Sequence, residues 1–157
     1  MKIRWAQVEY QPNLQHPVAP IRLGVIVEAI HGRRREVVLI GRAPKGPMPE
    51  FQVEDAWGPF RELVTNWFET VWKSAVGLMH EVEGNAFAVD RLATMWASNL
   101  YLKEPQTSSV AVTANLLTVA RYRYQSFVGQ RVPPFKGERP RIKPVRSWMN
   151  YTMQATG

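Results

Sequence analysis

The spacing of the apolar residues changes early in the chain, and this change limits the folds that the sequence can adopt. Across residues 21–29 every odd position is apolar, which is the period of two typical of a β-strand with one buried face. Across residues 60–82 the apolar residues recur at spacings of three and four, as they do on one face of a helix. Strands followed by helices predict an α+β fold.

Three strands are expected in the first part of the chain. Residues 3–10 are rich in side chains that favour strands, and residues 36–42 contain a continuous apolar run. Between the second and third strands, Gly32 is followed by three arginines, which predicts a hairpin turn at residues 31–35. Because short connections favour neighbouring strands, we expect an antiparallel meander of three strands.

Three helices are expected after a proline-rich loop at residues 43–49. The longest has about 24 residues, begins at Pro59 and ends before Gly84. A weaker apolar stripe predicts a helix at residues 88–100, and helical spacing returns over residues 114–128. Residues 103–109 are expected to be a polar loop, and residues 110–112 a short strand.

The net charge of +7 is carried entirely by the end of the chain. Residues 1–116 contain 12 basic and 12 acidic side chains, whereas residues 117–157 contain eight basic side chains and one acid. Four prolines among residues 129–157 resist helix and central strand. We therefore expect a single α+β domain at residues 1–128, with one long and two shorter helices on a small antiparallel sheet. An extended basic tail follows at residues 129–157.

Basic residues in three places are candidates for binding nucleic acid or an acidic protein surface. The hairpin turn is expected to project the guanidinium groups of Arg33, Arg34 and Arg35, which suit phosphate contacts. Arg121 and Arg123 alternate with tyrosines directly before the tail. The tail adds six more basic residues: Arg131, Lys136, Arg139, Arg141, Lys143 and Arg146. The alternative is that these charges only keep exposed segments soluble.

Four of the six tryptophans can be assigned a role from their sequence context, whereas Trp5 and Trp57 are ambiguous. Trp67, Trp72 and Trp96 lie on the apolar stripes of predicted helices, which predicts core positions. Trp148 lies in the basic tail, where we expect it and Tyr151 to be apolar anchors for the tail.

The sequence carries no signature of a catalytic or metal site. It lacks cysteine, which excludes thiol catalysis and thiolate zinc ligands. It also lacks a phosphate-binding loop and a nucleophile elbow, and its three histidines stand far apart. We expect Glu28 to form a structural ion pair with Arg22 or Arg4 rather than to act as an acid or base. No catalytic residue, metal or cofactor is therefore expected.

No apolar run approaches the roughly 20 residues needed to cross a bilayer. The first residues lack the apolar core of a signal peptide. We therefore expect a soluble, cytoplasmic protein that makes no contact with a membrane.

Two short stretches carry a resemblance. A strand at residues 5–10 stops before Pro12, and residues 20–27 read Pro-Ile-Arg-Leu-Gly-Val-Ile-Val. Residues 99–105, Asn-Leu-Tyr-Leu-Lys-Glu-Pro, precede the last helical stretch. In this order the motifs resemble a family of small uncharacterised bacterial proteins, some of which are encoded near HipA-like kinases. The resemblance implies an α+β fold and carries over no catalytic residue.

These observations favour a non-enzymatic accessory protein whose basic tail and hairpin arginines contact nucleic acid or an acidic partner within a larger assembly. The alternative is a regulatory or scaffold subunit that acts only through protein contacts, as a homo-oligomer or with another protein. Surplus apolar area on the long helix would then be its interface. An enzyme of unknown type is the third alternative. It ranks last because no nucleophile, base and orienting group stand out together.

Overall fold

The computed structural model describes residues 1–11, 20–42, 67–82, 84–95, 100–129 and 148–156. The α+β fold is confirmed: the described residues form three helices and a six-stranded sheet. The strands are β1 (Lys2–Tyr10), β2 (Ile21–His31), β3 (Arg34–Arg42), β4 (Leu100–Leu102), β5 (Gln106–Ser109) and β6 (Trp148–Thr156). The helices are α3 (Trp67–Glu81), α4 (Ala88–Met95) and α5 (Leu116–Val128).

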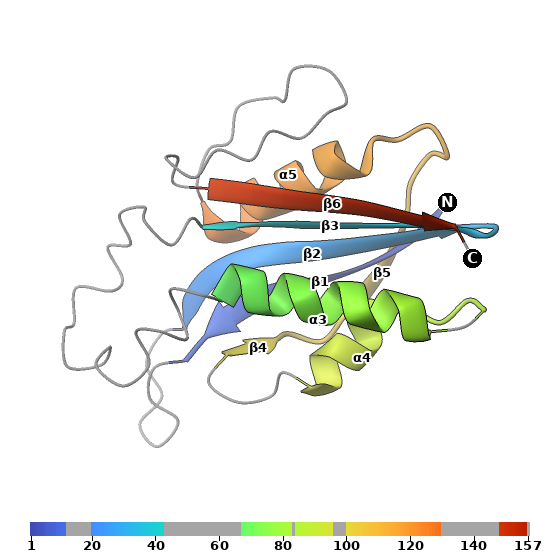
Figure 1. Cartoon of the computed structure of the whole chain (residues 1–157). Coiled ribbons are helices and arrows are strands. Elements are labelled where there is room, and N and C mark those ends of the chain that lie inside the picture. The colour runs from blue at the N-terminus through green and yellow to red at the C-terminus, as the bar shows by residue number, and fades with distance from the viewer. Residues whose placement is uncertain (12–19, 43–66, 83, 96–99, 130–147, 157) are drawn as a thin grey trace.

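All strand pairs are antiparallel, in the order β4-β1-β2-β3-β6 (Figure 1). β1, β2 and β3 form the expected meander. β4 and β5 share the outer edge of β1, where β4 pairs with residues 8–10 and β5 with residues 2–5. The segment after α4 is therefore held along the edge of the first strand.

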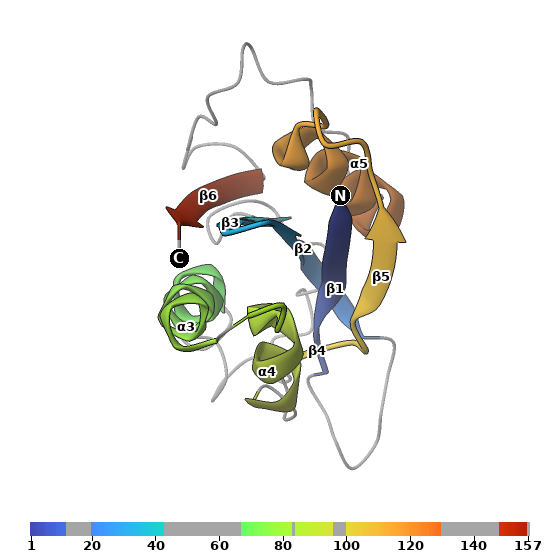
Figure 2. The same ribbon diagram turned by 90° about the vertical axis from the view of Figure 1, so that its right-hand side faces the viewer.

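Helices cover both faces of the sheet (Figure 2). α3 and α4 pack on one face, and α5 packs on the other, so the sheet lies between two apolar cores. In β3, Val37 and Leu39 face α3 and α4, whereas Val38 and Ile40 face α5. The expectation that residues 21–29 have only one buried face is wrong, because strands between two helical layers are buried on both sides.

Trp67 begins the described part of the long predicted helix and is fully buried. Its ring lies over Gly24 and Gly41, which are paired across β2 and β3. A Cβ on Gly24 would lie 2.8 Å from the Trp67 ring, and one on Gly41 would overlap that ring. The two glycines therefore form a notch that admits the indole. Of the other predicted core tryptophans, Trp72 is half-buried and Trp96 lies outside the described residues.

An irregularity in the β1–β2 pairing changes which side chains of β2 face α5. Gly24 lies opposite Val8, but Arg22 lies opposite Glu9, so Leu23 is an extra residue on β2. The alternation therefore reverses at this point. Leu23 turns to the α3–α4 core. Arg22 turns to the α5 face and reaches that helix.

Three local predictions are corrected by the structure. The helix predicted over residues 88–100 is described only as α4, and its expected last residue, Leu100, begins β4. The polar loop expected at residues 103–109 contains β5, while residues 110–112 form no strand. β5 is short, polar and paired on one side with β1, which is typical of an edge strand. The sequence does not predict this strand because its residues show no apolar alternation.

The end of the chain forms strand β6, which pairs with β3 over its whole length from Trp148 to Thr156. The backbone of the expected anchors Trp148 and Tyr151 lies opposite Arg42 and Leu39. The side chains of these anchors and the six basic tail residues between positions 131 and 146 lie outside the described residues. Residues 148–156 lie at the edge of the sheet as strand β6.

Candidate functional site

α5 is held at both ends, which fixes the side chains on its outer side. Asn115 accepts hydrogen bonds from the backbone N–H groups of Leu117 (2.9 Å) and Thr118 (3.3 Å) and so caps the first turn. Gly129 has a φ of 79° and donates its N–H to the carbonyl of Gln125 at 2.9 Å, which ends the helix. The buried stripe of α5 packs on β2 and β3.

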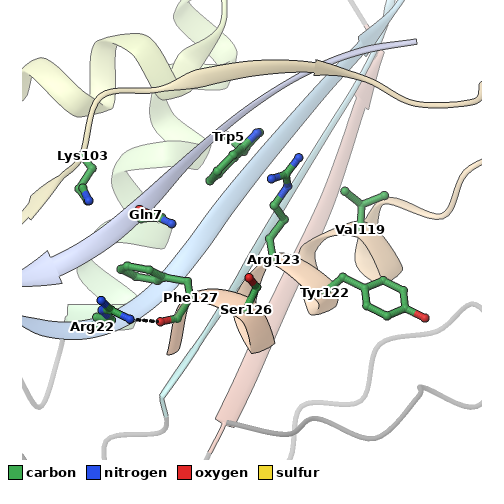
Figure 3. A pocket seen from close by; sticks show the side chains of 9 residues that line it. All are labelled: Trp5, Gln7, Arg22, Lys103, Val119, Tyr122, Arg123, Ser126 and Phe127. Carbon is green, nitrogen blue, oxygen red and sulfur yellow. Dashed lines mark hydrogen bonds between the residues drawn. The ribbon is translucent and has the colours of Figure 1, made fainter. Parts of the chain in front are cut away.

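A groove of about 590 Å³ lies between α5 and the β1 side of the sheet (Figure 3). Three cations line it, namely Arg22, Lys103 and Arg123. Three aromatic residues line it too: Trp5, Tyr122 and Phe127. Its remaining lining residues, Gln7, Val119 and Ser126, are neutral. Among the described residues, no carboxylate lines this groove, so its field favours an anion.

Arg123 is held in place by contacts with both β1 and β5. Its guanidinium carbon lies 4.0 Å from the centroid of the Trp5 ring, within the range of a cation–π contact. Its Nη2 donates to Ser108 Oγ at 3.2 Å, and Trp5 Nε1 donates to the same oxygen at 3.4 Å. Trp5 is buried, so the guanidinium rests on a rigid surface (Figure 3). Little side-chain entropy remains to be lost when Arg123 binds an anion.

Arg22 closes one end of the groove. Its Nη1 donates to the carbonyl of Phe127 at 2.9 Å, and its guanidinium lies 5.3 Å from the centroid of the Phe127 ring. A cation at the last carbonyls of a helix is favourable, so Arg22 stabilises the end of α5. Glu9 lies opposite Arg22 in the strand register but is buried, and its Oε1 accepts from the Tyr101 hydroxyl at 3.1 Å.

Lys103 and Tyr122 are exposed, as are the lining residues Arg22 and Ser126. Lys103 follows β4, and its backbone N–H donates to the carbonyl of Gln7 at 2.9 Å, which fixes the position from which its side chain extends. Tyr122 is 60% exposed at the rim, and its ring points outwards (Figure 3). Arg121 is buried, and its guanidinium carbon lies 4.5 Å from the centroid of that ring.

The structure separates the candidate arginines of the hairpin from this groove. Arg33 and Arg34 are exposed at the β2–β3 turn, where Gly32 has a φ of 60°. They come directly after β2, whose last residue is about nine residues beyond Arg22. At the rise of a strand this separation is roughly 30 Å. Of the described residues expected to bind an anion, only Arg123 lines the groove, and Arg121 contacts its rim.

Arg35 does not project into solvent, so that expectation is wrong. Its Nη1 lies 3.2 Å from Glu28 Oε2, and its guanidinium donates to the carbonyls of Ala86 and Gly84 at 2.7 Å each. The side chain must turn inwards because it shares a sheet face with the fully buried Glu28. The ion pair expected for Glu28 is therefore confirmed, but its partner is Arg35 rather than Arg22 or Arg4.

Glu28 holds the start of α4. Its carboxylate accepts from the backbone N–H groups of Ala88 (3.0 Å) and Val89 (2.9 Å), so a strand residue caps a helix that is distant in sequence. Burial raises the pKa of this carboxyl, against the opposing effect of these two N–H groups and of Arg35. The described partners of Glu28 hold the start of α4 against the β2–β3 hairpin.

Sequence reasoning missed Trp5, Arg22 and Lys103 as members of one site. Arg22 stands out only as a polar residue in an apolar stretch, and Lys103 carries no local signal. Among the described residues no group of three His, Cys, Asp or Glu side chains is arranged to hold a metal ion. No described helix is long and apolar enough to cross a membrane.

Comparison with protein families, with curated proteins and with solved structures found no match to this chain. The resemblance to small bacterial proteins encoded near HipA-like kinases therefore stays a prediction. The function has to be argued from the groove itself.

Proposed function

We propose that this protein is a non-enzymatic accessory protein that binds nucleic acid through the groove between α5 and β1. The observation that carries the proposal is the Arg123 guanidinium, which rests on Trp5 in a groove lined by three cations and no described carboxylate. Phosphate oxygens suit such a site, because arginine binds them with directed, charge-assisted hydrogen bonds. The basic tail and the exposed Arg33 and Arg34 would supply further backbone contacts to a long polymer.

The alternative, a subunit that acts only through protein contacts, rested on surplus apolar area on the long helix. Five side chains of α3 belong to the core shared with the sheet, namely Trp67, Val71, Ala75, Leu78 and Met79. None of the described large apolar side chains of α3 is exposed. The exposed large apolar residues of the described chain are Met95, Val112 and Tyr122, on three different segments. The described surface therefore favours a charged partner over an apolar one.

The proposal is tested by the affinity of the full chain for a fluorescently labelled 12-nucleotide single strand, measured by anisotropy over a range of salt. Arg123→Gln removes a charge-assisted contact worth about 1.5–3 kcal/mol. We therefore expect its affinity to fall by about tenfold or more. The slope of log affinity against log salt should also become shallower by about 0.7.

Arg91→Gln is the matched control. Arg91 is an exposed residue of α4, on the other face of the sheet, and the substitution removes the same charge. Its affinity should stay within about twofold of that of the wild type, since it lies outside the groove. Equal losses in both variants would show that only net charge matters. No binding by the wild type would contradict the proposal and favour a protein partner.

A further inference from the structure

Tyr122 is the one large aromatic side chain of the groove that is exposed rather than packed. Trp5 and Phe127 are 6% and 7% exposed, whereas Tyr122 is 60% exposed at the rim. Exposed aromatic rings beside ordered cations are typical of surfaces on which nucleic-acid bases stack. Of the three aromatic rings that line the groove, the Tyr122 ring is thus the one that a ligand can stack on.

The neighbouring Arg121 holds the Tyr122 ring in place. Arg121 is only 8% exposed, and its guanidinium lies over the ring at 4.5 Å from the centroid. Because Arg121 covers one face of the ring, the exposed area belongs to the other face and to the edge. The next residue along α5 is Arg123, so consecutive positions of one helix supply an exposed aromatic ring and an anchored cation that both line the groove.

Each nucleotide of a nucleic-acid strand presents both a phosphate and a base, so it offers a partner to the cation and to the ring. We infer that the groove binds a single strand rather than a duplex, with a phosphate at Arg123 and a neighbouring base stacked on Tyr122. In a duplex the bases stack on one another and are not free to lie on a protein ring. The neutral polar groups of Gln7 and Ser126 in the groove can hydrogen-bond to a base or sugar without repelling phosphate.

This inference rests on the proposed function and adds the class of nucleic acid. It is tested by anisotropy with a labelled 12-nucleotide single strand and with the same strand in a blunt duplex. We expect the wild-type full chain to bind the single strand about tenfold more tightly. Tyr122→Ser should weaken single-strand binding about tenfold, the loss typical of one base–aromatic stack, and leave duplex binding unchanged.

Tyr122→Phe is the matched variant, because it keeps the ring and should keep the wild-type affinity. The side chain is exposed, so neither variant removes core packing, and circular dichroism checks that each is folded. Equal affinity for strand and duplex, or an unchanged affinity in Tyr122→Ser, would overturn the inference while leaving phosphate binding by Arg123 intact. If neither nucleic acid binds, the proposed function itself fails.

Discussion

Two single residues determine how closely the α3 layer approaches the sheet. Gly24 and Gly41 pair across β2 and β3, and the ring of Trp67 fills the space that their missing side chains leave. Any side chain at Gly41 would occupy the position of that ring. The conformational entropy that two glycines cost in a strand is offset by burial of a whole indole.

Gly41→Ala should destabilise the fold by about 1–3 kcal/mol or more, because the added methyl group overlaps Trp67 in a close-packed core. Gly77→Ala is the control, since a Cβ at this exposed helical position meets nothing within 4 Å. It should stabilise the protein by about 0.5–1 kcal/mol through its better helix propensity. Urea unfolding of both variants measures the difference. Equal stability of Gly41→Ala and the wild type would show that Trp67 is free to move.

At the scale of elements, the start of α4 is held by residues of two strands. Glu28 of β2 caps its first N–H groups, and Arg35 of β3 binds the carbonyls of the turn before it. The buried pair therefore joins the β2–β3 hairpin to α4. On the same face, Arg4 of β1 forms an ion pair with Asp90 of α4 at 2.9 Å, which ties this helix to the sheet at a second point.

The effect of Glu28 on stability should depend on pH in a particular direction. Burial raises its pKa above the ordinary value of 4.5, so the folded chain holds this proton more tightly than the unfolded chain. Stability from this group is thus greatest below pH 4.5 and falls as the pH rises through the folded pKa. The free energy of unfolding of the wild type, minus that of Glu28→Gln, should therefore decrease from pH 4 upwards.

Urea unfolding of both proteins between pH 4 and pH 8 gives this difference directly. Glu104→Gln removes the same charge from an exposed loop and should change stability by less than about 0.5 kcal/mol at each pH. A difference for Glu28→Gln that grows with pH would show that the folded state prefers the carboxylate.

The elements with strong periodicity were predictable from the sequence, and those set by tertiary contacts were not. The bounds of β1, β2, β3 and α5 lie close to the predicted ones. β5 could not be predicted from the sequence, because its four residues are polar and its strand conformation comes from pairing with β1. Arg22 turns towards α5 because Leu23 is an extra residue on β2, and an alternating apolar pattern does not predict such an extra residue.

At the scale of the whole molecule, the candidate site exists only because the sheet brings together distant parts of the chain. Trp5 and Gln7 come from β1, Arg22 from β2 and Lys103 from the segment after β4, and α5 supplies the rest. The charge pattern of the sequence indicated an anionic partner and included Arg123. It could not place this residue on Trp5, since such contacts follow from strand order and helix packing rather than from spacing.

The central claim is that nucleic acid lies in this groove, and photochemical crosslinking of a bound single strand to the full chain tests it most directly. After ultraviolet irradiation and proteolysis, mass spectrometry identifies the peptides that carry nucleotides. We predict adducts on the peptide that contains Tyr122, and their loss when Arg123→Gln is irradiated under the same conditions. Adducts confined to the hairpin arginines or to residues 131–146, with none on α5, would contradict the account.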